Sequence, residues 1–309
     1  MKNKKTMSLI GAGVGVCILG TAALANYSTT NGYEALKQTL LYPADVPNCT
    51  MSIEGTMSYD GAELASGTYL LEKDADSALE HSKTESTTVD GVKSLREDWQ
   101  QDGMNIWYND YNEGYLGIRN AGDFFASTLL PAVETGDEKT DSKIKTFMSL
   151  LADTFVGDLR NNFVCVDDGE DAATYEVNLS SVQIPELVNA GLGAMLSLQN
   201  YTYETSEYYQ DNELTDTDVM VRSMAEDARV ESISAVFTIG HDNMIRNGEC
   251  SVVFAGEDEN GASHSFTVNG KLSVTDIGTT EVQKLDINSV DIEFLDVEPV
   301  DTESTEAVG

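Results

Sequence analysis

A series of turn dipeptides most constrains the fold, because these pairs separate short segments of alternating apolar and polar residues. The pairs are Asp60-Gly61, Asp90-Gly91, Asp102-Gly103 and Asn260-Gly261. Asp-Gly and Asn-Gly favour the tight turns that join neighbouring antiparallel strands, since both central residues of such turns adopt positive φ angles. Strands joined in this way pair with their neighbours in sequence. The chain is therefore expected to form an antiparallel meander rather than a parallel sheet with crossover helices.

The stretch from Cys49 to Tyr59 shows the alternation most clearly. Met51, Ile53 and Met57 fall on one face of a strand and the residues between them are mostly polar, which is typical of a strand with one solvated face. The same pattern along the chain predicts strands at residues 49–59, 63–73, 78–87, 93–101, 104–109, 114–119, 163–166, 174–179, 230–239, 244–255, 263–274 and 284–294.

Other segments are predicted to be helical from their apolar spacing and from the prolines that end them. These segments are residues 32–41, 123–130, 142–156 and 184–199. Strands and helices together predict an α+β fold, a large curved antiparallel β-sheet (half-barrel) with helices packed on the concave side. We expect a single domain over residues 26–295, and two smaller β domains meeting near residues 157–162 are the alternative. The acidic tail at 296–309 has no periodicity and is expected to be disordered.

The first 25 residues predict the compartment. Lys2, Lys4 and Lys5 precede an uncharged run, residues 7–25, that ends in small residues. This order is typical of a bacterial secretory signal peptide cut after Ala25. The same run is also just long enough to cross a bilayer as a retained anchor. Both alternatives predict an extracytoplasmic protein, secreted or anchored to the outer face of the cytoplasmic membrane, with membrane contact only through residues 7–25 if they are kept.

The charge of the chain excludes some partners. With 53 acidic and 18 basic residues the formal net charge is −35, and three of the basic residues lie in the leader. Such a chain repels nucleic acid and anionic lipid surfaces, so no nucleic-acid partner is expected. The acidic residues are spread along the sequence, which favours a role in solubility. A docking face for a basic partner is the alternative.

The cysteines do not suggest a disulfide framework. Cys49, Cys165 and Cys250 lie outside the leader, an odd number at wide spacing, so at most one bridge can form among them. None lies in a CxxC pair. We expect free, buried thiols that act as small apolar residues.

Catalytic and metal-binding patterns are absent from the sequence after the leader. His81, His241 and His264 have no zinc-ligand spacing and are expected at the surface. No nucleophile elbow, P-loop or dinucleotide-binding glycine pattern occurs there. We therefore expect a protein that is not an enzyme, with no catalytic residue, no metal and no cofactor.

The order of predicted elements resembles the LolA-like and LppX-like lipoprotein-carrier superfamily. A first helix at residues 32–41, a long meander at 49–119 and helices at 142–156 and 184–199 carry this resemblance, which is architectural and covers nearly the whole chain after the leader. Members have an open half-barrel whose mouth is covered by helices. The resemblance implies a carrier of lipid or lipoprotein at the cell envelope.

If the sheet is a half-barrel, its large apolar residues are expected to line a cavity for acyl chains. The expected lining residues of the sheet are Met51, Ile53, Met57, Leu70, Trp99, Ile106, Phe237, Phe254 and Phe266. The expected residues of the helical lid are Phe147, Met148, Leu151, Met195 and Leu198. The alternative is that these residues fill an ordinary core, because any half-buried sheet shows the same alternation.

Two functions from different classes follow from these predictions. The first is a non-enzymatic cell-envelope protein that binds a lipid or another apolar ligand in the half-barrel cavity. The second is an envelope scaffold or sensory protein that acts through protein–protein contacts, for which the tyrosine-rich stretch at residues 201–218 is a candidate surface.

Overall fold

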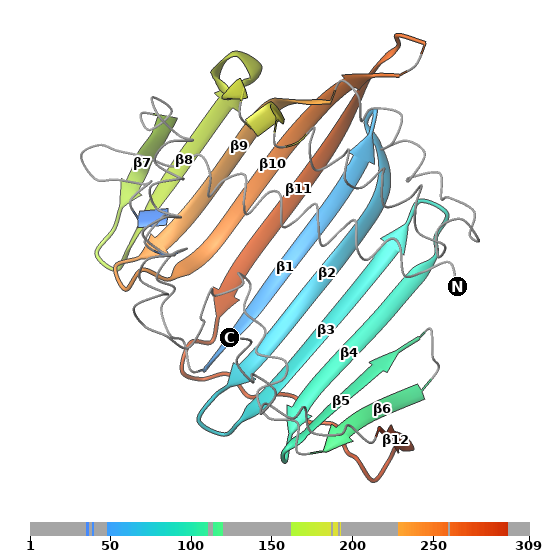
Figure 1. The fold of residues 1–309 in the computed structure, drawn as a ribbon. Coiled ribbons are helices and arrows are strands. Elements are labelled where there is room, and N and C mark those ends of the chain that lie inside the picture. Colours follow the sequence, from blue (N-terminus) through green and yellow to red (C-terminus); the bar gives the residue numbers. More distant parts are fainter. Residues whose placement is uncertain are drawn as a thin grey trace, which may run out of the picture.

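A computed structural model describes residues 35, 36, 39, 48–110, 114–119, 162–186, 188–190, 192, 228–258 and 260–295 of the chain. Within these residues all strands belong to one twelve-stranded sheet in the order β12-β6-β5-β4-β3-β2-β1-β11-β10-β9-β8-β7 (Figure 1). Neighbouring strands are antiparallel, except that β12 and β6 run parallel. The sheet is therefore mixed, but almost entirely antiparallel.

Two meanders meet at the centre of the sheet, where β1 pairs with β11. The first meander contains β1 (Asn48–Tyr59), β2 (Ala62–Asp74), β3 (Leu79–Thr88), β4 (Lys93–Gln101), β5 (Met104–Asn109) and β6 (Gly114–Arg119). The second contains β7 (Phe163–Asp168), β8 (Ala172–Ser180), β9 (Arg229–Gly240), β10 (Ile245–Glu257) and β11 (Ser263–Thr275). The short strand β12 (Ile292–Phe294) is added beside β6.

The turn dipeptides behave as the sequence predicts. Asp60 and Gly61, between β1 and β2, have φ angles of 48° and 81°, and Asp102 and Gly103, between β4 and β5, have 51° and 72°. Positive φ at both central residues is the conformation that tight hairpin turns require and that glycine adopts without strain. The prediction that Asp-Gly pairs build the meander is confirmed.

The cross-strand register divides the side chains between the two faces of the sheet. We call one side the Met57 face; it carries the odd-numbered residues of β1, from 49 to 59. The other side carries the even-numbered residues of β1, and we call it the Trp99 face. Thr50 lies opposite Glu72, Glu72 opposite His81, and His81 opposite Trp99, so all four side chains project from this second side.

The main apolar core lies on the Met57 face over the second meander and the adjoining strands β1 and β2. Its buried members are Leu36, Met57, Ala65, Phe163, Ala173, Tyr175, Val177, Leu179, Ile184, Val230, Ile233, Ala235, Phe237, Ile239, Val252, Phe254 and Val268. Most come from alternate positions of β8 to β11, as expected for strands with one buried face. Leu36 and Ile184 lie outside the strands, so the chain itself contributes to the covering of this end of the sheet.

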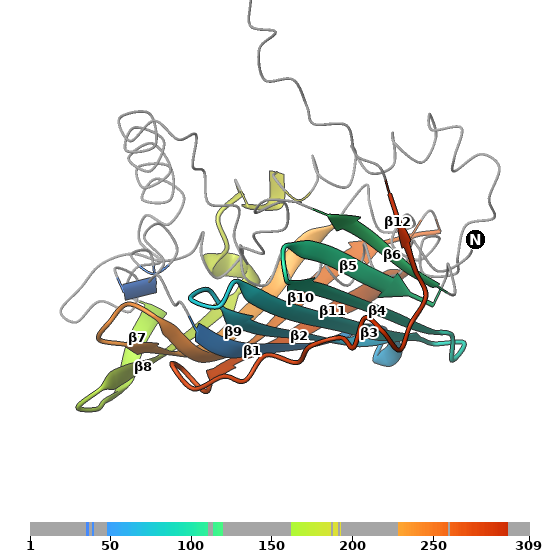
Figure 2. The same cartoon turned by 90° about the horizontal axis from the view of Figure 1, so that it is seen from below.

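The Trp99 face of the first meander is covered differently. After β11 the chain turns back and runs as an extended segment, residues 276–291, across the first meander to reach β12 at its far edge (Figure 2). In this view β5 and β6 rise away from the central strands, and the segment passes along the outside of the resulting curve. The backbone of this segment is bound on the Trp99 face by Asn48 of β1, Glu72 of β2 and Gln101 of β4.

The α+β class predicted from the sequence is wrong for the described part of the chain. Besides its strands, the only complete element there is the 3-10 turn η2 (Ser181–Gln183). The described residues are nearly all β and form one twelve-stranded mixed sheet. Within the helices predicted at 32–41 and 184–199, residues 35, 36, 39, 186, 188–190 and 192 are described as helical. The architecture of the described part is nevertheless determined by pairing among twelve strands.

The strand predicted at residues 284–294 is also wrong. Only Ile292–Phe294 is a strand, and it pairs parallel to β6. A turn interrupts the preceding residues, because the Ser289 N–H donates to the carbonyl of Asp286 at 2.9 Å. By contrast, the strands predicted at 93–101, 104–109 and 114–119 agree residue for residue with β4, β5 and β6.

Several predictions concern residues outside the described ranges. They are the leader at 1–25, the helices at 123–130 and 142–156, the loop at 201–218, the tail at 296–309, and the proposed lid residues Phe147, Met148, Leu151, Met195 and Leu198. Among the described residues, no helix has the length and apolar character needed to span a membrane.

Candidate functional site

The centre of the Met57 face carries a row of glycines. Gly270 of β11 lies opposite Gly55 of β1, and Gly55 lies opposite Gly67 of β2. The row continues to Ser86 of β3. Three adjacent strands thus present backbone rather than side chains at the same level, which allows another group to approach the sheet closely.

Larger side chains border this row on both sides. Toward the β1–β2 turn the neighbouring row is Val268, Met57 and Ala65, and on the other side it is Leu272, Ile53 and Tyr69. Residues on one face of a strand are spaced by ~7 Å, so the missing side chains leave a gap in the row about the width of a single alkyl chain. We call this row of glycines the glycine channel; its floor is backbone, the residues beside it are predominantly apolar, and Cys250 lies next to it at Gly270.

The character of the Met57 face changes between β2 and β3. The residues of β3 and β4 on this face are Glu80, Ser82, Thr84, Ser86, Thr88, Ser94, Arg96, Asp98 and Gln100. Arg96 donates to both oxygens of Asp98, at 2.8 and 2.7 Å. Those hydrogen bonds raise the pKa of the Arg96 guanidinium and hold the pair in its charged form. An apolar region over β9 to β2 therefore adjoins a polar band on β3 and β4.

Asn105 lies at the edge of this polar band and is the most unusual polar residue of the described chain. It is only 2 % exposed, and neither its Oδ1 nor its Nδ2 has a hydrogen-bond partner. Beside it is a small cavity of ≈ 20 Å³ whose lining includes Glu80, Asp98, Gln100 and Trp107. A buried polar atom without a partner costs about 1–3 kcal/mol, so this amide is a strong candidate for binding something polar.

The structure does not bring all the predicted cavity residues together. Six of them share the Met57 face, and the register places them at its apolar end: Met51, Ile53, Met57, Phe237, Phe254 and Phe266. Leu70, Trp99 and Ile106 project from the opposite side. Trp99 and Ile106 are 4 % and 1 % exposed and lie on the face that the segment following β11 crosses.

Two amide side chains hold that segment to the Trp99 face by its backbone. Gln101 donates to the carbonyl of Leu285 at 2.9 Å and accepts from its N–H at 2.8 Å. Asn48 makes the same pair of contacts with Thr280, at 3.0 and 2.7 Å. A side-chain amide that binds both backbone groups of one residue copies the pairing of a neighbouring strand. The segment is therefore fixed in register although it is not part of the sheet.

His81, beneath the same segment, is buried rather than at the surface, contrary to the sequence prediction. It is 1 % exposed, its Nδ1 lies 3.1 Å from Glu72 and its Nε2 lies 3.6 Å from Glu97. Its ring stacks on Trp99 with 5.4 Å between centroids. The same Glu72 oxygen accepts the backbone N–H of Gln283 at 2.9 Å, which links this cluster to the covering segment.

A polar groove occupies the Trp99 face of the central strands, with a volume of ≈ 540 Å³. Its side chains are Glu54, Thr56, Asn178, Ser234, Val236, Glu249, Ser251, Asn269 and Lys271. Lys271 and Glu249 form an ion pair at 3.0 Å, which raises the pKa of the lysine. The volume is within the usual range of ligand sites, but the lining is polar and open rather than apolar.

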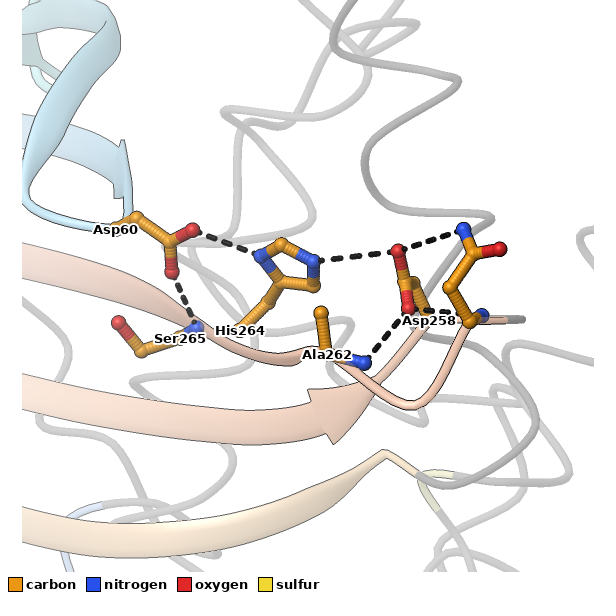
Figure 3. Close-up of polar contacts among 6 residues, drawn as sticks. Asp60, Asp258, Ala262, His264 and Ser265 are labelled. Carbon is orange, nitrogen blue, oxygen red and sulfur yellow. Dashed lines mark hydrogen bonds and ion pairs between the residues drawn. The ribbon is translucent and has the colours of Figure 1, made fainter.

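His264 connects two hairpin turns at one end of the sheet (Figure 3). Its ring lies between Asp60 and Asp258, at 2.8 and 3.7 Å, and stacks on Tyr59. The hydrogen bond to Asp60 and the charges of both carboxylates raise the pKa of His264. Asp60 and Asp258 have lowered pKa values, chiefly because Asp60 bonds His264 and Asp258 accepts the backbone N–H of Ala262. We call the cluster of Asp60, Asp258 and His264 the clasp; it links the β1–β2 turn to the β10–β11 turn through charged groups.

The remaining candidate groups show no catalytic arrangement. Cys49, Cys165 and Cys250 are free thiols, and burial raises the pKa of Cys49 and Cys165, which weakens them as nucleophiles. No group of three or more His, Cys, Asp or Glu side chains in the described ranges is placed to hold a metal ion.

Comparison with known proteins gives only distant likenesses. No family model and no curated protein matches the chain. Among solved structures, a LolA superfamily protein from Nitrosomonas europaea aligns over 84 % of this chain and 94 % of its own, with 8 % identity and a TM-score of 0.21. A porin-like protein from Bacteroides uniformis aligns over 75 % and 98 %, with 10 % identity and a TM-score of 0.24. A beta-barrel-like protein from Brucella abortus has a TM-score of 0.17.

These scores are too low to show a common fold, so the likeness to LolA stays one of general architecture. The class of protein is defined by the molecule itself. In its described part the chain forms a single β-sheet with one face that is apolar over β9 to β2 and polar over β3 and β4.

Proposed function

We propose that this chain is a non-enzymatic, extracytoplasmic binding protein of the cell envelope that holds the acyl chain of a lipid or lipoprotein against the Met57 face. The leader supports the location, since it has the order of a secretory signal or anchor. The single observation that carries the ligand class is the glycine channel, formed where Gly270, Gly55 and Gly67 meet in register. An alkyl chain laid there would gain ~25 cal/mol for each Å² of apolar surface it buries.

The position of half-exposed apolar residues favours the first meander as the place of binding. Met51, Tyr69, Trp107 and Leu116 lie on the Met57 face and are neither buried nor fully exposed. The core over the second meander is instead tightly buried. A ligand would therefore run from the glycine channel across the polar band of β3 and β4 toward the half-exposed apolar residues of β5 and β6.

Filling the channel tests this proposal. Gly67→Leu places a branched side chain in the channel floor, and Gly67→Ala places a single methyl group there. Thr68→Leu is the matched control, because Thr68 is the next residue of β2 and projects, exposed, from the Trp99 face. Tritiated monooleoylglycerol retained by the protein after gel filtration is the readout, with circular dichroism to confirm an intact sheet.

The expected result is graded loss of retained lipid, small for Gly67→Ala and nearly complete for Gly67→Leu, with Thr68→Leu unchanged. Equal retention by a folded Gly67→Leu protein and the wild type would exclude the channel as the binding site. No retention by the wild type would refute the ligand class altogether.

A second candidate function, that of an envelope scaffold, is favoured by the polar groove on the Trp99 face. Glu54 and Glu249 are exposed there and Lys271 is already paired with Glu249, so the surface suits a basic polar segment of a partner protein. Ser251→Trp would fill this groove. A scaffold should then lose an identified cross-linked partner, while the retention of lipid stays unchanged.

A further inference from the structure

The strongest unexplained feature of the Met57 face is the buried amide of Asn105. Both of its polar atoms lack a partner although the residue is 2 % exposed. The adjoining cavity of ≈ 20 Å³ exceeds the space of roughly 10–15 Å³ that one water-sized polar group needs. An amide and a cavity of this size together form a site for one polar group.

The chemistry of the amide selects that group. Oδ1 only accepts hydrogen bonds and Nδ2 only donates them. A carboxylate can satisfy Nδ2 but not Oδ1, and an ammonium group can satisfy Oδ1 but not Nδ2. A hydroxyl group satisfies both, because it donates one hydrogen bond and accepts others.

The surrounding charge points the same way. The cavity lining includes the carboxyl groups of Glu80 and Asp98. Asp98 is neutralised as a pair with Arg96, so the guanidinium is not free to bind an anion. A phosphate or carboxylate headgroup would find no unpaired cation among the described residues that line the cavity, and it would be repelled by the net charge of the chain, −35.

Asn105 and the glycine channel lie on the same face at a distance that suits one long ligand. Gly67 and Asn105 are separated by three strand spacings across the sheet, from β2 to β5. Along the strands they are separated by three steps between residues of the same face, as from position 94 to position 100 of β4. Strand spacing and residue rise convert this to roughly 25 Å. An acyl chain with its head at Asn105 would reach the channel with its far end, after crossing the polar band of β3 and β4.

We propose that Asn105 binds the hydroxyl headgroup of an uncharged, long-chain amphiphile, such as an acylglycerol, and that the protein discriminates against fatty acids and phospholipids. This inference rests on the proposed acyl-chain binding, since it assigns the head of the same ligand.

The test compares two lipids with the same chain, tritiated monooleoylglycerol and oleic acid, on the full-length protein. The hydroxyl makes one neutral hydrogen bond more than the carboxylate, the one to Oδ1, and its contribution of about 1 kcal/mol predicts about fivefold tighter binding of the glycerol ester. Asn105→Leu should abolish this preference by weakening only the ester. Asn178→Leu, at an exposed asparagine of the Trp99 face, should leave it unchanged.

The outcomes separate this inference from the function on which it depends. Equal binding of both lipids by the wild type, with a water molecule alone beside Asn105 in a crystal structure, would overturn the headgroup assignment and leave acyl-chain binding intact. Failure of both lipids to bind would refute the proposed function itself. Because the comparison of lipids uses the wild type, it does not depend on the folding of any variant.

Discussion

Gln101→Leu is expected to release the segment that crosses the Trp99 face. Gln101 is 3 % exposed and its amide holds both backbone groups of Leu285, at 2.9 and 2.8 Å. Leucine fills a similar volume, but its side chain can neither donate nor accept a hydrogen bond. Each neutral hydrogen bond contributes about 0.5–1.5 kcal/mol net, and water can reach Leu285, which is half-buried, so the expected loss is about 1–3 kcal/mol.

Urea unfolding followed by circular dichroism measures this loss, and limited proteolysis between residues 281 and 291 reports local detachment. Gln283→Leu is the control, because the exposed Gln283 side chain is changed while its backbone N–H still reaches Glu72 at 2.9 Å. A loss in the free energy of unfolding below about 0.5 kcal/mol, with unaltered proteolysis, would contradict the account, because two lost hydrogen bonds should together cost more than that.

Three further predictions concern packing, charge and close approach. Ile106→Ala should destabilise the fold by about 2–5 kcal/mol in urea unfolding, because Ile106 is 1 % exposed; a cost below about 1 kcal/mol would show that the site is not packed. His264 has a raised pKa, so its contact with Asp60 stabilises the fold at and below pH 6.5 and is lost as pH rises through the raised value. The melting-temperature advantage of the wild type over His264→Gln should therefore shrink above pH 6.5, and a constant difference from pH 6 to 9 would exclude the clasp. Gly117→Val should expose β12 to proteolysis, because a Cβ at Gly117 would lie 2.9 Å from the Phe294 ring; unchanged cleavage would refute this contact.

Local patterns predicted the strands of the sheet well because hairpins are determined by neighbouring residues. Asp60-Gly61 and Asp102-Gly103 form the expected turns, and the strand at residues 93–101 agrees with β4. What the sequence could not provide is the pairing of β1 with β11, which joins residues more than 200 positions apart. Such a contact leaves no local pattern, so the sequence predicts one large sheet but not which strands join its two meanders.

The placement of Trp99 shows why the candidate site was only partly predictable. Alternation identifies which residues of a strand share a face, but not which face meets the ligand and which meets another segment. The sequence analysis grouped Trp99 with Met51 because both are large and apolar, and register places them on opposite sides.

His81 was missed for a related reason, because the backbone of Gln283, far along the chain, binds the Glu72 that contacts it. Asn105 could have been suspected only as a polar residue beside the apolar Ile106, which is a weak pattern.

Native mass spectrometry of the wild-type protein, exported from a bacterial host and followed by organic extraction, tests the central claim most directly. The account predicts a discrete bound mass that extracts as an acylated molecule with an uncharged hydroxyl head. A protein of bare mass, whose melting temperature does not change on addition of monooleoylglycerol, would contradict it and would mean that the Met57 face is filled by the protein's own side chains.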